Sequence, residues 1–188
     1  MHALRTARLI VRPFALDDVE AAHRVLDLDL QWAGPGFSME QRRERVQFHI
    51  GLATWGFYGG TYGDRAIVLQ DSGEWIGMCG FRPWLTSALE RAQFDPQRMA
   101  LEHPGRSLEL GVGYALSSHH RDQGYATEAV KALLEYAFTE VKVCRVAALT
   151  ELGNHRSVNL MLRVGMTVGF KPDPEVVYPW GIGMIEKA

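Results

Sequence analysis

The chain has 188 residues, and its 20 Lys and Arg against 22 Asp and Glu give a formal net charge of −2. Hydrophobic residues make up 47% and charged residues 22%, which is typical of a globular domain and excludes a disordered chain. The charge balance gives no overall reason to expect nucleic acid or an anionic membrane as a partner. No stretch reaches the roughly 20 apolar residues of a membrane span. The length fits a single domain over residues 1–188.

The two cysteines, Cys79 and Cys144, are too few for a disulfide scaffold and form no CxxC pair. We therefore expect both to be reduced, buried core residues of a cytoplasmic protein. The first sixteen residues contain three arginines and no acid, as organellar transit peptides do. Residues 8–14, however, alternate in the manner of a half-buried strand, which favours the cytoplasmic interpretation.

The first third of the chain predicts a strand and two helices. After the strand at 8–14, two capping-box spacings begin helices, one from Asp17 to about residue 28 and one from Ser38 to about residue 54. The second helix carries three arginines that we expect to face solvent, namely Arg42, Arg43 and Arg45. Glycines then break the segment 55–64, which is typical of a loop.

The middle of the chain predicts a hairpin, an irregular segment and a glycine-containing strand. Two apolar runs flank Asp71-Ser72-Gly73 and predict a β-hairpin over 66–81. The segment 83–106 is long and broken by prolines, a pattern of functional loops. The strand at 108–116 contains two glycines, which suggest a bulge or a ligand lying close to the backbone.

The remainder predicts a helix, a strand, a helix and a final strand or strand pair. The first of these helices is strongly amphipathic. Its apolar stripe consists of Ala126, Val130, Leu133, Leu134, Ala137 and Phe138. A strand at 145–149, a helix at 154–164 that Gly165 ends, and strand pattern at 176–185 complete the chain. Because strands and helices alternate in mixed order, the fold class is α/β or α+β.

Several common catalytic motifs are absent from the sequence. It holds no GxxxxGK[ST], no GxGxxG between a strand and a helix, no HExxH and no GxSxG. The adjacent pair His119-His120 does not make a metal site by itself. We therefore expect no bound metal.

The segment 121–127, Arg-Asp-Gln-Gly-Tyr-Ala-Thr, lies between a predicted strand and a predicted helix. A helix start leaves backbone N–H groups free and carries the positive end of the helix dipole, so it can hold a phosphate. Gly124 lets the backbone approach such a ligand. An ordinary strand–helix turn is the alternative interpretation. Further along, Asn154-x-x-Ser157 at a helix start fits a helix cap, a ligand contact or both.

The runs 109–116 (ELGVGYAL) and 120–129 (HRDQGYATEA) resemble motif A of the GCN5-related N-acetyltransferases, or GNAT superfamily. Three further landmarks match the ribosomal-protein alanine/serine acetyltransferase branch in order: 7–14 (ARLIVRPF), Ile76-Gly77-x-x-Gly80, and Asn154-x-x-Ser157. The resemblance covers about residues 7–170. It implies a central mixed, mostly antiparallel twisted sheet, splayed at the strand that binds acetyl-CoA and flanked by helices.

The resemblance also implies an acetyl-CoA site and no metal. The pyrophosphate is expected on backbone N–H groups of the helix-start loop, the pantetheine alongside the splayed strand, and a side-chain amide on the pantetheine arm. The residues so assigned are Tyr114, Ala115, Leu116, Arg121, Asp122, Gln123, Gly124, Tyr125, Ala126, Thr127 and Asn154. Asp122 departs from the family, which usually has glycine at that position, and its carboxylate must point to solvent to avoid the pyrophosphate.

The implied chemistry is direct attack of an amine on a thioester, without a covalent enzyme intermediate. An alkylamine with a pKa near about 10.4 must lose a proton first, so a general base or water chain is needed. Many members carry an acid where this chain has Gly111, and Glu109 lies about 6.7 Å further back on the same strand face. Glu109 is the proposed base, with Ser157 and Tyr178 as candidate acids for the leaving thiolate.

The acceptor is the least determined element of this prediction. The branch resemblance favours a protein N-terminal α-amine. The alternatives are a small-molecule amine, such as an aminoglycoside, polyamine or amino acid, or a catalytically silent acyl-CoA-binding module. We expect the segment 83–106 to shape the acceptor site, with a homodimer contact or a disordered excursion as the alternatives.

Overall fold

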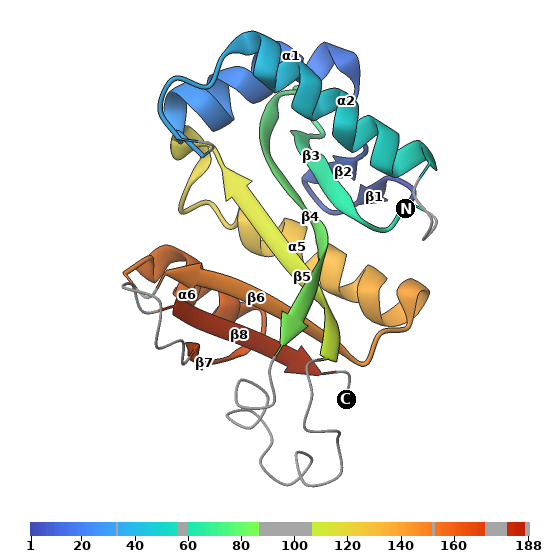
Figure 1. Ribbon diagram of the computed structural model, residues 1–188, viewed down its shortest axis with the longest axis vertical. Coiled ribbons are helices and arrows are strands. Elements are labelled where there is room, and N and C mark those ends of the chain that lie inside the picture. The colour runs from blue at the N-terminus through green and yellow to red at the C-terminus, as the bar shows by residue number, and fades with distance from the viewer. Residues whose placement is uncertain (33, 56–59, 87–106, 152, 172–179, 187–188) are drawn as a thin grey trace, which may run out of the picture. The chain divides into compact units, whose positions relative to one another are not determined.

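The computed structural model describes residues 1–32, 34–55, 60–86, 107–151, 153–171 and 180–186 (Figure 1). The strands are β1 (Leu4–Arg5), β2 (Leu9–Arg12), β3 (Gly63–Leu69), β4 (Trp75–Thr86), β5 (Ser107–Leu116), β6 (Arg145–Glu151), β7 (Thr167–Lys171) and β8 (Trp180–Glu186). The helical elements are η1 (Leu16–Asp18), α1 (Val19–Ala22), η2 (His23–Asp29), α2 (Met39–Trp55), η3 (Ser118–His120), α5 (Tyr125–Tyr136), η4 (Ala137–Val141) and α6 (His155–Arg163).

Hydrogen bonds link the described strands in the order β1-β2-β3-β4-β5-β6-β8-β7. The β5–β6 pair is parallel, whereas β1–β2, β2–β3, β3–β4, β6–β8 and β7–β8 are antiparallel. The α/β class and the mixed, mostly antiparallel sheet expected from the sequence are therefore confirmed.

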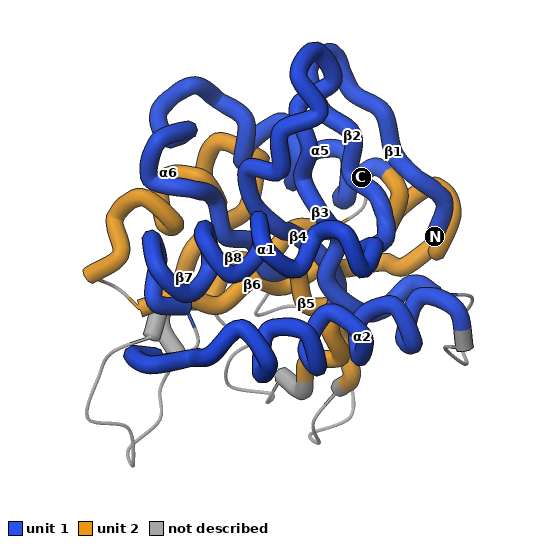
Figure 2. The backbone as a smooth tube through the Cα atoms, turned by 90° about the horizontal axis from the view of Figure 1, so that it is seen from above, with its two compact units in different colours: residues 1–81, 113–135 blue, residues 82–112, 136–188 orange. Residues whose placement is uncertain are grey.

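The chain divides into two compact units, residues 1–81 with 113–135 and residues 82–112 with 136–188 (Figure 2). The boundaries at 81/82 and 112/113 fall inside β4 and β5, and the one at 135/136 falls inside α5. No boundary lies in a loop. A single domain over the whole chain remains a prediction.

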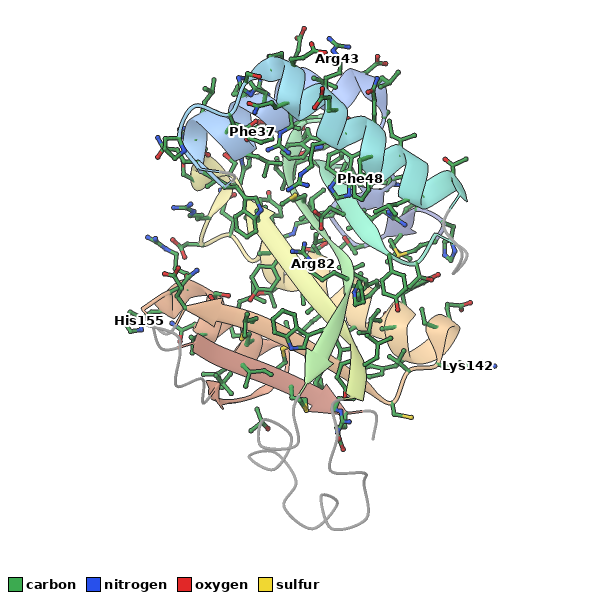
Figure 3. All side chains as sticks on the ribbon, in the orientation of Figure 1. Phe37, Arg43, Phe48, Arg82, Lys142 and His155 are labelled. Carbon is green, nitrogen blue, oxygen red and sulfur yellow. The ribbon has the colours of Figure 1, made fainter. Side chains whose placement is uncertain are left out.

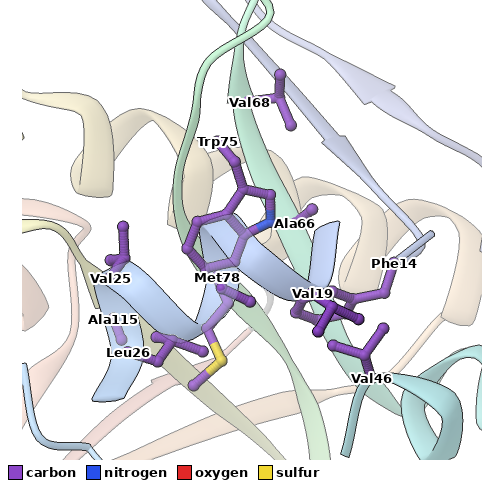
Figure 4. Packing of buried hydrophobic residues seen from close by; sticks show 11 residues of the cluster. Phe14, Val19, Val25, Leu26, Val46, Ala66, Val68, Trp75, Met78 and Ala115 are labelled. Atoms are coloured by element: carbon purple, nitrogen blue, oxygen red, sulfur yellow. The ribbon is translucent and has the colours of Figure 1, made fainter. Parts of the chain in front are cut away.

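The first unit is built around the hairpin that the sequence predicts. β3 and β4 pair antiparallel, with Ala66 opposite Met78, and Gly73 occupies the turn with a φ of +71°. The helical segments between 19 and 55 add apolar side chains to these strands (Figure 4). The buried cluster comprises Phe14, Val19, Ala22, Val25, Leu26, Val46, Ala66, Val68, Trp75, Met78 and Ala115. This core fixes the strands that lead into the 121–127 segment.

A close approach of two strands in the same unit depends on a glycine. A Cβ added to Gly77 in β4 would lie 2.3 Å from the carbonyl oxygen of Ala115 and 3.0 Å from the Cα of Leu116, both in β5. Any side chain at Gly77 would therefore push β5 away. The glycine of the Ile76-Gly77 landmark thus sets the position of the strand end that precedes the loop.

The second unit contains the parallel contact of the sheet. β5 pairs with β6 from Leu110↔Val146 to Val112↔Ala148, and β8 pairs with the whole of β6. α6 ends before Gly165, whose φ of +91° confirms the predicted helix stop. The sequence interpretation missed β7, because this five-residue strand begins two residues after that glycine and is too short for a clear alternation.

Several sequence expectations need correction in detail. The predicted helix from Asp17 to about residue 28 consists of three helical pieces, η1, α1 and the π-helical η2. Of the three arginines expected to face solvent, Arg42 is buried and donates from Nε and Nη2 to Asp27 at 2.8 and 2.5 Å. Arg43, in contrast, projects from the outer side of α2 (Figure 3). Arg42 is buried and Arg43 is not because Asp27, a buried acid in η2, pairs with Arg42.

The two cysteines also differ. Cys79 is buried in β4, and burial together with the Asp64 carboxylate raises the pKa of its thiol. Cys144 is exposed just before β6, so the expectation that it lies in the core was wrong. The turn that connects η4 to β6 leaves it on the surface.

Candidate functional site

The 121–127 loop joins η3 to α5 in the first unit, where the sequence predicts a strand–helix turn. Two of its residues have left-handed backbone conformations, Asp122 with φ +60° and Gly124 with φ +83°. Aspartate tolerates this conformation better than most side chains, which explains how it can stand where the family usually has glycine. The Asp122 side chain is exposed.

The backbone N–H groups of the 121–127 loop donate to no acceptor among the residues that the structure describes. The first helical hydrogen bond beyond them runs from the N–H of Glu128 to the carbonyl of Gly124, at 3.0 Å. The last three of these free donors belong to the first turn of α5, where the helix dipole is positive. This segment therefore offers a row of donors to an anion.

A carboxylate from η2 holds the entry to the loop. Asp29 accepts a hydrogen bond from the Ser118 N–H at 2.8 Å and one from the Ser117 hydroxyl at 3.2 Å. Partial burial raises the pKa of Asp29, but these hydrogen bonds and the nearby His119 outweigh it, so the pKa lies below its ordinary value of 3.8. The sequence interpretation missed Asp29, because 88 residues separate it from Ser117.

A second carboxylate holds the exit from the loop. Glu128 in α5 accepts at Oε1 from the Thr6 hydroxyl at 2.6 Å and from the Arg8 N–H at 2.8 Å. Burial raises the pKa of Glu128, but the hydrogen bonds from Thr6 and Arg8 and the charge of Arg8 outweigh it, so the pKa lies below its ordinary value of 4.5. The N-terminal residues thus contact the helix that follows the loop.

The end of β5 lies in the same unit as the loop. Ala115 is buried, while Tyr114 and Leu116 are half-buried. The structure therefore groups these three assigned residues with the seven of the 121–127 loop in one compact unit.

Asn154 and Ser157 lie at the start of α6 in the second unit. The Asn154 Oδ1 accepts the Ser157 N–H at 3.2 Å, which confirms that Asn154 caps this helix. Asn154 is exposed and Ser157 is half-buried. An amide cap uses only its oxygen, so its NH₂ can still donate to a ligand.

Glu109 is buried in β5 of the second unit, and only 7% of the residue is exposed. Its two carboxylate oxygens accept from Nε and Nη2 of Arg145 at 3.0 and 2.8 Å. Arg145 also donates to Glu186 at 3.2 Å. Arg145 thus occupies both carboxylate oxygens of Glu109, whereas a general base must reach the proton of the attacking amine.

Gly111, two residues after Glu109 in β5, packs closely against β4. A Cβ added to Gly111 would lie 3.1 Å from the carbonyl oxygen of Arg82 and 3.2 Å from the Cβ of Trp84, both in β4. The sequence left open whether a bulge or a close ligand requires this glycine. The backbone and side chains of β4 account for it.

The remaining predictions concern Tyr178, the segment 83–106, a metal site and membrane-spanning helices. Tyr178 and most of the segment 83–106 lie outside the described residues. Among the residues that are described, no group of three or more His, Cys, Asp or Glu side chains could hold a metal ion. The described helices include none with the length and apolar character needed to cross a membrane.

Comparisons with known proteins give one consistent result. The family model for the acetyltransferase (GNAT) domain matches residues 8–167. An uncharacterized N-acetyltransferase p20 of Bacillus licheniformis is 26% identical over 171 residues, which are 86% of this chain and 80% of that protein.

Two solved structures share the fold. The RimL ribosomal L7/L12 alpha-N-protein acetyltransferase in complex with coenzyme A superposes with a TM-score of 0.69 and 16% identity, covering 98% of both chains. The microcin C7 self-immunity acetyltransferase in complex with acetyl-CoA and AMP superposes with a TM-score of 0.71 and 15% identity, covering 97% of this chain and 94% of that one.

Proposed function

Because this chain belongs to the GNAT acetyltransferase family, we propose that it transfers the acetyl group of acetyl-CoA to a primary amine. The favoured acceptor is the α-amine of a protein N-terminus. The family assignment makes the protein an acetyltransferase; the donor and the acceptor are the proposed parts.

The observation that carries the choice of donor is the free row of N–H groups in the 121–127 loop. A pyrophosphate needs several donors and a positive potential, and a glycine-containing helix start supplies both without a lysine. Gly124 keeps the backbone accessible, and the exposed Asp122 can direct its carboxylate to solvent. The residues present therefore fit a CoA pyrophosphate.

Two further groups are proposed to hold the rest of the donor. The backbone of Tyr114, Ala115 and Leu116 would lie along the pantetheine, and the Asn154 NH₂ would donate to an amide carbonyl of the pantetheine arm. The second proposal depends on the side-chain NH₂ of Asn154, which the helix cap does not use. RimL and the microcin acetyltransferase, which share this fold, were solved with CoA and acetyl-CoA respectively.

The proposed reaction is a direct attack of the acceptor amine on the thioester carbonyl. Acetyl-CoA supplies the activated acyl group, and a backbone N–H of β5 would donate to the developing oxyanion. Glu109 remains the proposed base, although both of its carboxylate oxygens already accept from Arg145. Ser157 and Tyr178 remain the proposed acids for the leaving thiolate. The raised thiol pKa of buried Cys79 opposes a covalent route through that residue.

The acceptor proposal depends on the order of sequence landmarks that match the ribosomal-protein branch. Of the two structures described above, RimL is named for a ribosomal protein, and the other is named only for self immunity to microcin C7. A small-molecule amine therefore remains the second candidate. A silent acyl-CoA-binding module is the third.

The test is a thiol-release assay with acetyl-CoA and a panel of N-terminal peptides, aminoglycosides, polyamines and amino acids. We expect the highest kcat/KM with a peptide α-amine, and intersecting rather than parallel initial-rate patterns for a ternary complex. A higher kcat/KM with a small amine would instead identify the protein as a small-molecule acetyltransferase. CoA binding without thiol release for any amine would favour the silent module.

A further inference from the structure

The N-terminal landmark 7–14 has no role in the function proposed above, yet one of its side chains contacts the 121–127 loop. Arg8 precedes β2, and 115 residues separate it from Gln123 in sequence. Both residues lie in the first unit. The contacts of the Arg8 guanidinium are therefore evidence about how the loop is held.

The guanidinium makes a forked contact with the first turn of α5. Its Nε donates to Glu128 Oε2 at 2.8 Å, and its Nη2 lies 2.7 Å from the same oxygen. The Arg8 N–H and the Thr6 hydroxyl occupy Glu128 Oε1. Both carboxylate oxygens are thus used, and the start of the helix is tied to the N-terminal strands.

The same guanidinium contacts the loop itself. Nη1 donates to the carbonyl oxygen of Gln123 at 2.9 Å, and the guanidinium carbon lies 4.3 Å from the centre of the Tyr125 ring. A Cβ added to Gly124 would lie 3.4 Å from Nη2. Arg8 therefore touches three consecutive residues, Gln123, Gly124 and Tyr125.

The bond to Gln123 has a geometric consequence for an anion site. In a planar trans peptide, the C=O of one residue and the N–H of the next point in opposite directions, and the described chain contains no cis peptide bond. Because the Gln123 carbonyl points to Arg8, the N–H of Gly124 points away from Arg8. One hydrogen bond thereby fixes the direction of a donor in the middle of the loop.

The charge of Arg8 is not available to a phosphate in the same way. The pairing with Glu128 makes the two side chains neutral together, and three guanidinium nitrogens already donate to protein acceptors or pair with them. An arginine that binds phosphate directly presents its fork to the ligand. Here the fork is directed to the helix and the loop.

We propose that Arg8 is a positioning residue that holds the backbone of the 121–127 loop in the conformation that presents its free N–H groups to CoA. This inference rests on the proposed use of CoA. A loop that is already ordered before binding loses less conformational entropy when CoA binds. We therefore expect a change at Arg8 to alter the affinity for CoA.

The decisive variant is Arg8→Lys, which keeps the charge but cannot donate to Glu128 and Gln123 in one plane. We expect the dissociation constant for CoA, measured by calorimetry, to rise about tenfold. The KM for acetyl-CoA should rise in parallel, while kcat at saturating donor stays within about twofold. The matched control is Arg5→Lys, because Arg5 is exposed and its guanidinium donates to the side chain of Gln70 at 3.3 Å.

Dephospho-CoA separates positioning from direct contact. It keeps the pyrophosphate but lacks the 3′-phosphate, so a positioning role predicts the same loss of affinity for both compounds. A loss confined to CoA would mean that Arg8 binds the 3′-phosphate, and the positioning role would be overturned.

A measurement without ligand keeps this inference distinct from the proposed function. In ¹⁵N relaxation, Arg8→Lys should lower the order parameters of residues 121–127, and Arg5→Lys should not. Failure of the wild-type protein to bind CoA would contradict the proposed function, and the relaxation data would still decide whether Arg8 orders the loop. Unchanged order parameters would refute the inference.

Glu128→Gln provides a second variant should Arg8→Lys fold poorly. It weakens the same fork from the partner's side while Arg8 stays in place, so CoA affinity should fall in the same direction. In the double variant the two losses should be clearly less than additive. Full additivity would contradict a shared role.

Discussion

At the scale of single residues, Gly124 combines a φ of +83° with a place in the middle of the proposed phosphate-binding loop. We expect Gly124→Val to raise the dissociation constant for acetyl-CoA at least about tenfold, or about 1.4 kcal/mol, because a β-branched side chain disfavours this backbone conformation and covers the donors. Calorimetry on the folded variant measures this change.

The matched control for this substitution is Gly73→Val. Gly73 also has a positive φ, +71°, and an added Cβ would have no atom within 4 Å. The control therefore imposes similar backbone strain in the β3–β4 turn, away from the loop. If both variants bind acetyl-CoA equally well, the loop assignment fails.

Two variants separate the role of Asn154 as a helix cap from its proposed role as a ligand contact. Asn154→Ala removes both roles. It should lower the free energy of unfolding by about 1 kcal/mol and weaken the binding of acetyl-CoA by about 1–3 kcal/mol. Asn154→Ser keeps a capping oxygen but has no NH₂, so its melting temperature should stay near the wild-type value. Its KM for acetyl-CoA should rise as in the alanine variant. A serine variant with unchanged KM would leave Asn154 as a cap alone.

Glu109 is tested against its neighbour Glu186, since both accept from Arg145. The ion pair leads us to expect that Glu109→Gln lowers stability by about 1–3 kcal/mol and lowers kcat less than about tenfold. A general base would instead cost about 100-fold or more and remove the acidic limb of the pH–rate profile. Glu186→Gln should resemble Glu109→Gln in kcat if both acids are structural, so a kcat loss confined to Glu109→Gln would restore the base hypothesis.

At the scale of elements, the loop is held by carboxylates at both ends: Asp29 of η2 accepts from Ser118 in η3, and Glu128 lies in α5. Each has a pKa below its ordinary value in the folded protein. A lowered pKa means that the charged form is favoured by folding, so each group stabilises the protein fully above its ordinary pKa. That stabilisation is lost as the pH falls through the lowered value.

The lowered pKa of Asp29 predicts how the stability of Asp29→Asn depends on pH. The variant should be less stable than the wild type at pH 7, by about 1 kcal/mol for the weakened hydrogen bonds. The difference should begin to shrink as the pH falls below 3.8, the ordinary value, because the carboxylate of the unfolded wild type is then protonated. It should reach its minimum once the pH passes the lowered value, at which the folded carboxylate also binds a proton. Urea titrations at pH 7 and at pH 3 measure it. A difference that is constant with pH would mean that Asp29 does not contribute through its charge.

At the scale of the whole molecule, the segment 83–106 is the largest part of the chain whose role is still a prediction, and residues 87–106 lie outside those described. Replacing 88–102 with a short Gly/Ser linker should raise the acceptor KM strongly and change acetyl-CoA affinity less than about threefold. Residues 83–86 of the segment belong to β4, and β5 begins at Ser107, directly after the segment. Loss of a dimer in sedimentation, with unchanged acceptor kinetics, would assign the segment to an interface instead.

The sequence by itself determined the elements whose signals are local. The β3–β4 hairpin follows from two apolar runs around a turn that ends in Gly73. The continuous helix of α5 and η4 follows from an apolar stripe of which four residues are buried, Val130, Leu133, Leu134 and Ala137. The order of landmarks also determined the family. Periodicity and turn chemistry act over a few residues, so one sequence is enough to recognise them.

Only the tertiary structure decided which partner each polar side chain has. Glu109 faces Arg145, Arg42 faces Asp27, and Arg8 reaches the 121–127 loop across 115 residues of sequence. Cys144 is exposed because of the turn that precedes β6. Ion pairs and hydrogen bonds require atoms within about 3.5 Å, and this proximity depends on how distant segments pack rather than on their spacing along the chain.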